Sequence, residues 1–186
     1  GYARNIAIKK SKTKYIAFLD SDDLWAKNKL KIQINFMEKN NIPFSHTSFY
    51  IINANNKIIS SRFAKKKIIF KDLIASCDIG LSTVILESSL LIKNKLLFPK
   101  IKTKEDYVLW LKIIKKINII KGLENKLTFY RKTKGSLSSN KLLSLINGYK
   151  VYRDYMKYGV TKSLFYLFIL SINSLKKIVI NLFNIK

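Results

Sequence analysis

The run Asp20-Ser21-Asp22-Asp23 places three carboxylates where they could hold a divalent metal ion. It follows residues 15–19, an apolar segment that predicts a short, fully buried strand, and open α/β sheets bind ligands at the C-terminal ends of their strands. On an extended backbone Asp20 and Asp22 would point to the same face. Mg²⁺ and Mn²⁺ commonly bind through one or two carboxylates, and substrate phosphates complete the shell. We therefore expect Asp20 and Asp22 to bind Mn²⁺ or Mg²⁺; the plainer interpretation is that the acids cap a helix, as we expect of Asp23.

A second acidic pair, Glu105-Asp106, lies at the start of a predicted buried helix over residues 104–116. Thr103 and Asp106 have the spacing of a capping box, which stabilises a helix by about 0.5–2 kcal/mol. The same position suits a general base, because the helix dipole favours the charged carboxylate. Both roles are compatible. Trp110, one turn further on, faces either the same cleft or the core, and the core is the commoner place for such a residue.

A third candidate is the basic, glycine-containing loop over residues 130–138. In such a loop Arg131 can contact a phosphate through two parallel hydrogen bonds, and Lys134 can act as a point charge. In a lysine-rich chain a charge run is more often only a solvated face. His46 and Cys77 receive no functional role.

Composition limits the classes of protein that this chain can represent. It has 186 residues, 48% of them hydrophobic, which indicates one globular core. The net charge is +25, but only four of the 36 basic residues are arginines. Because base-reading proteins depend on bidentate arginine contacts, we do not expect nucleic acid as the partner. A single cysteine and a single histidine argue against disulfides and zinc sites and favour a reducing, cytoplasmic setting. The chain starts at Gly1 without an initiator Met, so we expect it to be part of a longer protein.

Hydrophobic periodicity and turn residues predict alternating strands and helices. Strands are expected over 15–19, 44–52, 58–61, 82–86 and 127–130, the second and third forming a β-hairpin. Helices are expected over 3–10, 24–39, 71–76, 104–116, 141–157 and 162–186. In the last of these, apolar residues recur every three or four positions: Leu164, Phe168, Ile172, Leu175, Val179 and Leu182. The uninterrupted apolar run in this segment is far shorter than the roughly 20 residues that a membrane span needs. The helix is therefore expected either to lie in a membrane interface or to pack on the domain.

Three features in this order resemble the family 2 glycosyltransferases of the GT-A fold. They are Ala3-Arg4-Asn5-Ile6-Ala7 ahead of the strand and the Asp20-Ser21-Asp22-Asp23-Leu24-Trp25 motif, then Glu105-Asp106-Tyr107-Val108-Leu109-Trp110-Leu111, then Tyr130-Arg131 with Gly135-Ser136-Leu137-Ser138. Ser82-Thr83-Val84 is similar to a segment of these enzymes near the acceptor. The resemblance covers residues 1–139, which would be the C-terminal part of a GT-A catalytic domain; residues 140–186 would be a helical tail, for which membrane association is one of the expected roles.

The resemblance implies a Rossmann-like α/β fold, a mixed sheet flanked by helices that lacks its first βαβ units, followed by amphipathic helices. It implies inverting transfer of a sugar from a nucleotide-diphosphate sugar to a hydroxyl acceptor. Asp106 would be the base and Glu105 would orient the acceptor or the base. Arg4, Asp20 and Arg131 would contact the nucleotide sugar, and Asp20 and Asp22 would hold Mn²⁺ or Mg²⁺.

The expected role is the synthesis of a bacterial surface glycan, such as lipopolysaccharide, capsule or exopolysaccharide, on a glycan or lipid-linked acceptor. The expected place is the cytoplasm at the inner face of the plasma membrane, with peripheral contact through residues 162–186. Two alternatives remain open: a non-catalytic basic module that binds anionic membrane or nucleic acid by charge alone, and an inactive glycosyltransferase remnant. Dependence on metal and on Asp22 and Asp106 distinguishes an active enzyme from both.

Overall fold

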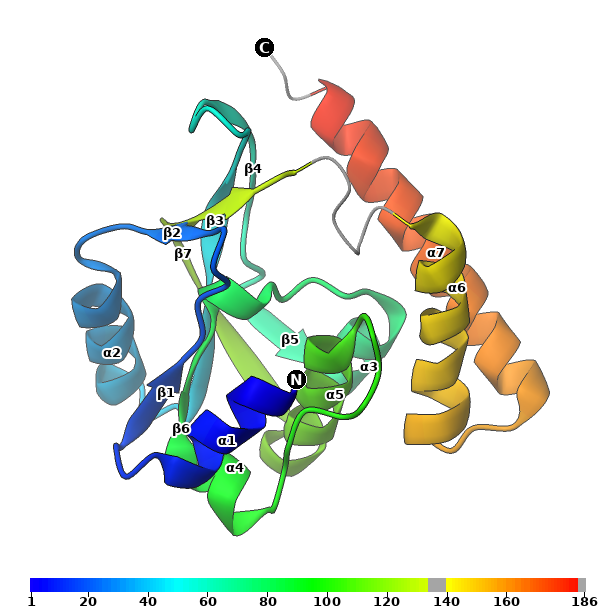
Figure 1. Cartoon of the computed structure of the whole chain (residues 1–186), viewed down its shortest axis with the longest axis horizontal. Helices are drawn as coiled ribbons and strands as arrows, with labels where there is room; N and C mark the ends of the chain where they lie inside the picture. The colour runs from blue at the N-terminus through cyan, green and yellow to red at the C-terminus, as the bar shows by residue number, and fades with distance from the viewer. Residues whose placement is uncertain (134–139, 184–186) are drawn as a thin grey trace.

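The computed structural model describes residues 1–133 and 140–183, with side chains up to Lys177 in the last helix. Figure 1 shows a twisted sheet with α2 on one side and α3 and α5 on the other. The elements in chain order are α1 (Tyr2–Lys10), β1 (Tyr15–Ala17), β2 (Leu24–Trp25), α2 (Lys29–Lys39), β3 (Phe44–Ile52), β4 (Ile58–Arg62), β5 (Lys67–Ile69), α3 (Phe70–Ala75), the 3₁₀ turn η1 (Leu81–Thr83), β6 (Ile85–Glu87), α4 (Ser88–Lys93), α5 (Glu105–Ile117), β7 (Ile119–Arg131), α6 (Lys141–Lys150), the π-helical turn η3 (Val151–Tyr155) and α7 (Val160–Phe183). The expected mixed sheet flanked by helices is therefore confirmed.

The sheet has the strand order β1-β6-β3-β7-β2, with β4 paired to β3 and β5 paired to β7. The long strands β3 and β7 run parallel, whereas β6 is antiparallel to both β1 and β3. The short strand β2 pairs antiparallel with the end of β7, Leu24 opposite Phe129 and Trp25 opposite Thr128. This pairing brings the acidic run beside the C-terminal end of β7.

The core lies between the sheet and α5. Seven residues of α5 are buried, and the Trp110 ring contacts three other rings at centroid distances of 5.1–6.3 Å, those of Phe18, Phe44 and Phe98. Trp110 is fully buried, so it belongs to the core and not to a cleft. Edge-on aromatic packing of this kind adds about 0.5–1.5 kcal/mol per pair beyond the burial of surface.

Several predicted boundaries were wrong. The helix expected over 24–39 begins only at Lys29, because Leu24 and Trp25 are taken up by the pairing with β7. Lys29 and Gln33 occupy its buried face beside Met37. The first strand covers Tyr15–Ala17 and is partly, not fully, buried. The segment expected as a strand over 82–86 divides into η1 and β6.

The helix caps were also wrong. Asp23 does not cap α2, whose N-cap is Asn28. Thr103 does not cap α5: the N-cap is Lys104 with φ of 66°, and the Thr103 hydroxyl accepts a hydrogen bond from Asn147 instead. A capping box needs an extended backbone at the N-cap residue, which a left-handed Lys104 does not provide.

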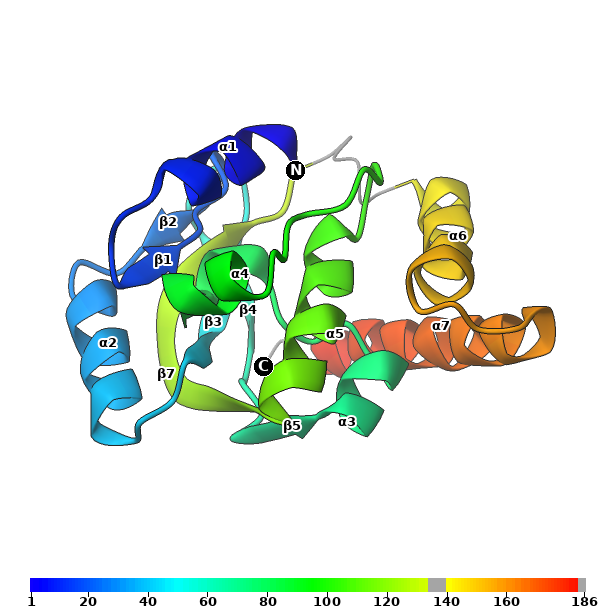
Figure 2. The ribbon, with the colours of Figure 1, turned by 90° about the horizontal axis from the view of Figure 1, so that it is seen from below.

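The C-terminal helices α6 and α7 pack against each other, and α7 also contacts α3. Figure 2 shows the pair extending from the side of the domain that carries α3. Gly148 permits the close approach, because a Cβ there would lie 2.9 Å from Leu167 Cδ1. Asn173 Nδ2 donates to the Ala75 carbonyl at 2.9 Å, which joins α7 to α3. Within the described residues, no helix combines the length and the apolar character that a membrane crossing requires.

Candidate active site

The acidic run forms a tight turn at the end of the first strand. The Asp23 amide donates to the Asp20 carbonyl at 3.0 Å, so the backbone turns back after Asp20 and is not extended as expected. The Asp20 amide in turn donates to the Ser82 hydroxyl at 3.0 Å. Asp22 is exposed and Asp23 is buried. The Ser82 hydroxyl of η1 therefore fixes the turn, and Asp22 is exposed to solvent.

Asp23 and Arg131 join this turn to the end of β7. One Asp23 carboxylate oxygen accepts the Arg131 amide at 2.9 Å, and Arg131 Nε donates to the Asp22 carbonyl at 2.8 Å. Arg131 Nη1 donates to the Asn53 carbonyl at 3.0 Å. Burial raises the pKa of Asp23, and the hydrogen bonds from Ser82 and Arg131 oppose that rise. Arg131 thus lies beside the acidic turn and orders its backbone; the rest of the predicted basic loop, residues 134–139, lies outside the described residues.

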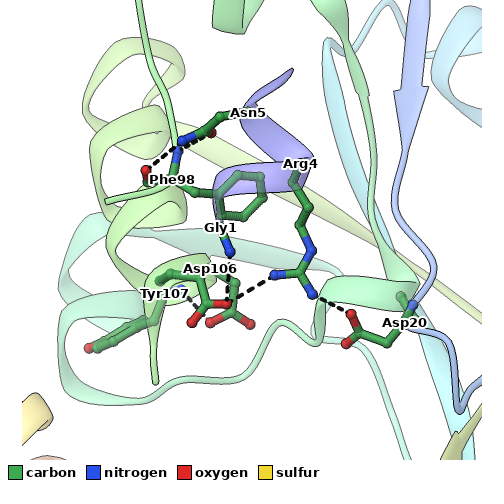
Figure 3. A network of polar contacts seen from close by, with 9 residues as sticks. Gly1, Arg4, Asn5, Asp20, Phe98, Asp106 and Tyr107 are labelled. Carbon is green, nitrogen blue, oxygen red and sulfur yellow. Dashed lines mark hydrogen bonds and ion pairs between the residues drawn. The ribbon is translucent and has the colours of Figure 1, made fainter. Parts of the chain in front are cut away.

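Arg4 links the acidic turn to the start of α5. Its Nη2 lies 2.5 Å from Asp20 Oδ1, and its Nη1 lies 2.9 Å from Glu105 Oε1. Figure 3 shows the Arg4 guanidinium directed at Asp20. All three side chains are 20–34% exposed. The three residues that the sequence placed in separate motifs therefore meet in one ion-pair network.

Asn5 holds Arg4 in this position. Its Nδ2 donates to the Phe98 carbonyl at 2.9 Å, and its Oδ1 accepts the Phe98 amide at the same distance. The Phe98 ring also lies 5.6 Å from the Arg4 guanidinium carbon. This double hydrogen bond fixes α1 against the segment that leads into α5.

Asp106 is partly buried next to that network (Figure 3). Its Oδ1 accepts the Tyr107 amide at 2.7 Å. Burial raises the pKa of the Asp106 carboxyl to about 6, the nearby charges of Glu105 and Asp20 act in the same direction, and the amide hydrogen bond and Arg4 oppose the rise. We expected the helix dipole to favour the anionic form of this carboxylate; burial shifts the pKa in the opposite direction. A pKa near 6 still leaves Asp106 mostly ionised at neutral pH, and it makes the carboxylate a stronger base than an ordinary aspartate.

Tyr107 anchors this end of α5. Its hydroxyl lies 2.9 Å from the carbonyl oxygens of both Leu73 and Ile74 and 3.2 Å from the Tyr152 hydroxyl. Tyr152 is fully buried beneath α7 and also donates to the Ile74 carbonyl at 2.9 Å. The position of Asp106 therefore depends on a buried tyrosine pair.

An open groove of about 380 Å³ runs between α1 and β1, next to this network. Arg4, Ala7 and Ile8 line it from the helix, and Tyr15, Ile16 and Leu19 line it from the strand side. Arg4 thus belongs to both the groove and the ion-pair network.

The residues present fit a divalent ion only in a limited way. Within the described part of the chain, no group of three or more His, Cys, Asp or Glu side chains is arranged to hold a metal. Two aspartates in one turn suffice when donor phosphates supply further oxygens, which is the usual arrangement for Mg²⁺ at phosphate sites. Asp22 is exposed and suited to this, whereas Asp20 is engaged by Arg4.

The sequence reasoning missed two residues that support the site. It treated Ser82 as part of a strand, but Ser82 fixes the Asp20 amide, and its carbonyl accepts Trp25 Nε1 at 2.7 Å. It gave no role to Lys29, which is fully buried and donates to Gln33 Oε1 at 2.5 Å and to the Thr83 carbonyl at 3.2 Å. The sequence signal for these contacts was limited to the segment Ser82-Thr83-Val84, which resembles the family and contains both Ser82 and the Thr83 carbonyl that Lys29 contacts.

Comparison with known proteins agrees with this fold and shows the family of the chain. The family model for glycosyl transferase family 2 matches residues 1–96 of the chain. The chain is 40% identical over 176 residues to the Escherichia coli UDP-Glc:alpha-D-GlcNAc-diphosphoundecaprenol beta-1,3-glucosyltransferase WfgD, and the alignment covers 94% of this chain and 68% of WfgD. It is 43% identical over 147 residues to E. coli WfaP, which carries the same enzyme name, covering 77% of this chain and 56% of WfaP.

Among solved structures, S. aureus TarS 1–349 in complex with UDP-GlcNAc superposes with a TM-score of 0.65 at 22% identity, covering 90% of this chain and 50% of TarS 1–349. That likeness supports a GT-A fold. The chain belongs to glycosyl transferase family 2. It spans about half to two thirds of the length of these relatives.

Proposed function

We propose that the protein containing this chain is an inverting glycosyltransferase that moves a sugar, glucose in the first instance, from a UDP-sugar to a hydroxyl group of a lipid-diphosphate-linked acceptor. The observation that carries the proposal is the position of Asp106, which lies in the first turn of α5 beside the Arg4 bridge to the acidic turn. The enzyme names of WfgD and WfaP support UDP-glucose as donor and a polyprenyl-diphosphate sugar as acceptor. The product would enter a bacterial cell-surface glycan.

In this proposal Asp106 is the general base. Its carboxylate takes the proton of the acceptor hydroxyl while that oxygen attacks the anomeric carbon from the face opposite the diphosphate. The new carbon–oxygen bond forms, the bond to the diphosphate oxygen breaks, and UDP leaves with the electron pair, so the configuration inverts. A pKa of about 6 keeps most of Asp106 ionised at pH 7 and leaves it able to accept the proton.

Arg4, Asp20 and Arg131 are proposed for the donor side, and Glu105 for orientation. Arg4 pairs with both Asp20 and Glu105, and its single positive charge offsets one of their two negative charges, which reduces the repulsion of a negatively charged nucleotide. Glu105 precedes Asp106 at the start of α5 and is held by Arg4, so it fixes the direction of that first turn. Arg131 orders the turn through the Asp22 carbonyl, and a contact with donor phosphate would add to that role.

Asp22, with Asp20, would hold Mn²⁺ or Mg²⁺. A bound divalent ion would neutralise the charge that develops on the leaving diphosphate. The chain's own contribution is the ordered turn, which the Ser82 hydroxyl and the Arg131 side chain keep in one conformation.

The proposed place of action is the cytoplasmic face of the bacterial plasma membrane, because a water-soluble nucleotide sugar and a lipid-linked acceptor meet there. The acceptor class rests on the names of the relatives. Peripheral membrane contact through the C-terminal helices is part of this proposal.

The test is a donor panel with the full-length protein. Release of UDP, GDP or dTDP is measured for the corresponding sugars, with and without Mn²⁺, and with a GlcNAc-diphosphate-lipid acceptor analogue. Wild type is compared with Asp22→Ala, Asp106→Asn and a control, Asp154→Asn, which removes an exposed acid on η3. Acceptor-dependent release of UDP by wild type and the control, lost in the other two variants, supports the proposal. No turnover with any donor, together with salt-sensitive binding to anionic polymers or vesicles, favours the charge-driven module or the inactive remnant.

A further inference from the structure

The apolar stripe of α7 points away from the body of the protein. Leu164 is 52% exposed, Phe165 58%, Phe168 63% and Leu175 62%. At 100° per residue these positions fall on one side of a helix. Three of these four, Leu164, Phe168 and Leu175, belong to the stripe that the sequence pattern identified in the tail, so these three periodic residues are not the ones that hold α7 to the domain.

A different face of α7 makes the attachment. Ser163 and Leu170 are buried, Asn173 Nδ2 donates to the Ala75 carbonyl at 2.9 Å, and Lys177 Nζ donates to the Cys77 carbonyl at 3.2 Å. Lys177 also pairs with Asp78, whose pKa is lowered by that ammonium and by Lys65 against the opposing effect of burial. Because α7 is held along one side by these contacts, its outward stripe is presented in a fixed orientation.

Helix α6, packed beside α7, carries exposed apolar residues of its own. Leu142 is 69% exposed, and Leu145 and Ile146 are 45% and 46% exposed. We call these residues with the α7 stripe the outer apolar face: Leu142, Leu145, Ile146, Leu164, Phe165, Phe168 and Leu175. Single exposed apolar residues are ordinary on a soluble protein, but a run of large ones along two packed helices indicates an interaction surface.

The positive charge of the residues around the outer apolar face indicates an anionic partner. Between residues 140 and 183, Lys177 is paired with Asp78 on the domain side; the other six basic residues are Lys141, Lys150, Arg153, Lys157, Lys162 and Lys176, against one acid, Asp154. A symmetric pair of chains would place the same basic patch against itself, which like-charge repulsion opposes. Anionic lipid headgroups neutralise the lysines while the acyl region takes up the apolar side chains.

We propose that the outer apolar face lies in the interface of an anionic lipid bilayer, with α6 and the first two thirds of α7 parallel to the membrane plane. The inference rests on the proposed function for its purpose, since it would hold the active site near a lipid-linked acceptor. It places the contact on α6 as well as α7, and it assigns the face of α7 around Asn173 and Lys177 to the domain and not to the membrane.

The test measures sedimentation of the full-length protein with phosphatidylcholine vesicles and with vesicles that contain one quarter phosphatidylglycerol. The variant is Leu164→Glu with Phe168→Glu. Its matched control is Ile58→Glu with Ile92→Glu, which removes two apolar side chains of similar exposure, 50% and 51%, from β4 and α4, and changes the net charge equally. Circular dichroism confirms that both remain folded.

We expect wild type and control to bind the anionic vesicles, with binding reduced by high salt, and the variant to bind at least tenfold more weakly. Equal binding by variant and control, or no binding by any of them, overturns the proposal. A wild-type dimer in sedimentation velocity that the variant alone dissociates, with vesicle binding unchanged, shows that a second copy covers this face and also overturns it. Transfer to a water-soluble acceptor analogue is measured in parallel with the wild-type protein. Vesicle binding without transfer contradicts the proposed transfer reaction only, and transfer without vesicle binding contradicts the membrane contact only.

Discussion

The charges around Asp106 predict that two substitutions should move the pH profile of transfer in opposite directions. With a pKa of about 6, Asp106 is about 90% ionised at pH 7 and about 10% at pH 5, so kcat/KM should fall roughly tenfold between these pH values. Removing the negative charge of Glu105, as in Glu105→Gln, lowers the pKa of Asp106 and moves the acidic limb to lower pH. Removing the positive charge of Arg4, as in Arg4→Gln, raises that pKa and moves the limb to higher pH.

The assay is the rate of UDP release at subsaturating acceptor from pH 4.5 to 8.5 at constant ionic strength. Both variants should also lose activity, because Arg4 joins Asp20 to Glu105, but the midpoint of the acidic limb is independent of the maximum rate. Asp106→Asn should reduce the rate by about 10²–10⁴-fold, the range typical of a general base. If the acidic limb stays near pH 6 in wild type, Arg4→Gln and Glu105→Gln, the assignment of this limb to Asp106 is refuted. Midpoints that shift in the same direction in Arg4→Gln and Glu105→Gln would refute it as well.

Three further predictions concern the scaffold. Gly122→Ala should cost about 3 kcal/mol in urea unfolding, because a Cβ would lie 2.3 Å from a backbone carbonyl, whereas Gly159→Ala, with nothing within 4 Å, should change stability by less than about 0.5 kcal/mol; equal midpoints would contradict the packing of β7. Burial lowers the pKa of Lys29 to about 7, so between pH 7 and 10 the unfolded chain binds more protons than the folded chain, and the free energy of unfolding should rise with pH across that window. Lys29→Met should flatten this rise in thermal unfolding. An unchanged slope in the variant would contradict the lowered pKa of Lys29. Ser82→Ala leaves the Asp20 amide without its acceptor and should lower kcat/KM about tenfold, while Ser82→Thr, which keeps the hydroxyl, should retain most activity; similar losses in both would exclude the hydroxyl as the cause.

The sequence could indicate candidate site residues because short motifs carry their own local signals. A carboxylate run after an apolar strand and an acidic pair at the start of a buried helix are visible without any tertiary information. The expected helix over 104–116 appears as α5 (Glu105–Ile117), and the expected hairpin appears as β3 and β4. Seven buried residues within α5 explain why its apolar density was so clear a signal.

Long-range pairing accounts for most of what could not be predicted. Leu24 and Trp25 continue the helical pattern of the residues that follow, but they pair with β7 more than 100 positions later. Lys29 reads as a solvated residue because its partner, the Thr83 carbonyl, is remote in sequence. The direction in which the α7 stripe points was equally hidden, since periodicity shows that a helix has two faces and does not show which one the domain covers.

The most direct test of the central claim is the configuration of the product formed from UDP-glucose, which is α-configured at the anomeric carbon. The full-length protein is incubated with UDP-glucose and the GlcNAc-diphosphate-lipid analogue, and the anomeric coupling constant of the product is measured by NMR for wild type, Asp106→Asn and Asp154→Asn. Attack assisted by Asp106 from the face opposite the diphosphate predicts a β-linked product from wild type and Asp154→Asn, and almost none from Asp106→Asn. An α-linked product, or an undiminished yield from Asp106→Asn, would contradict it.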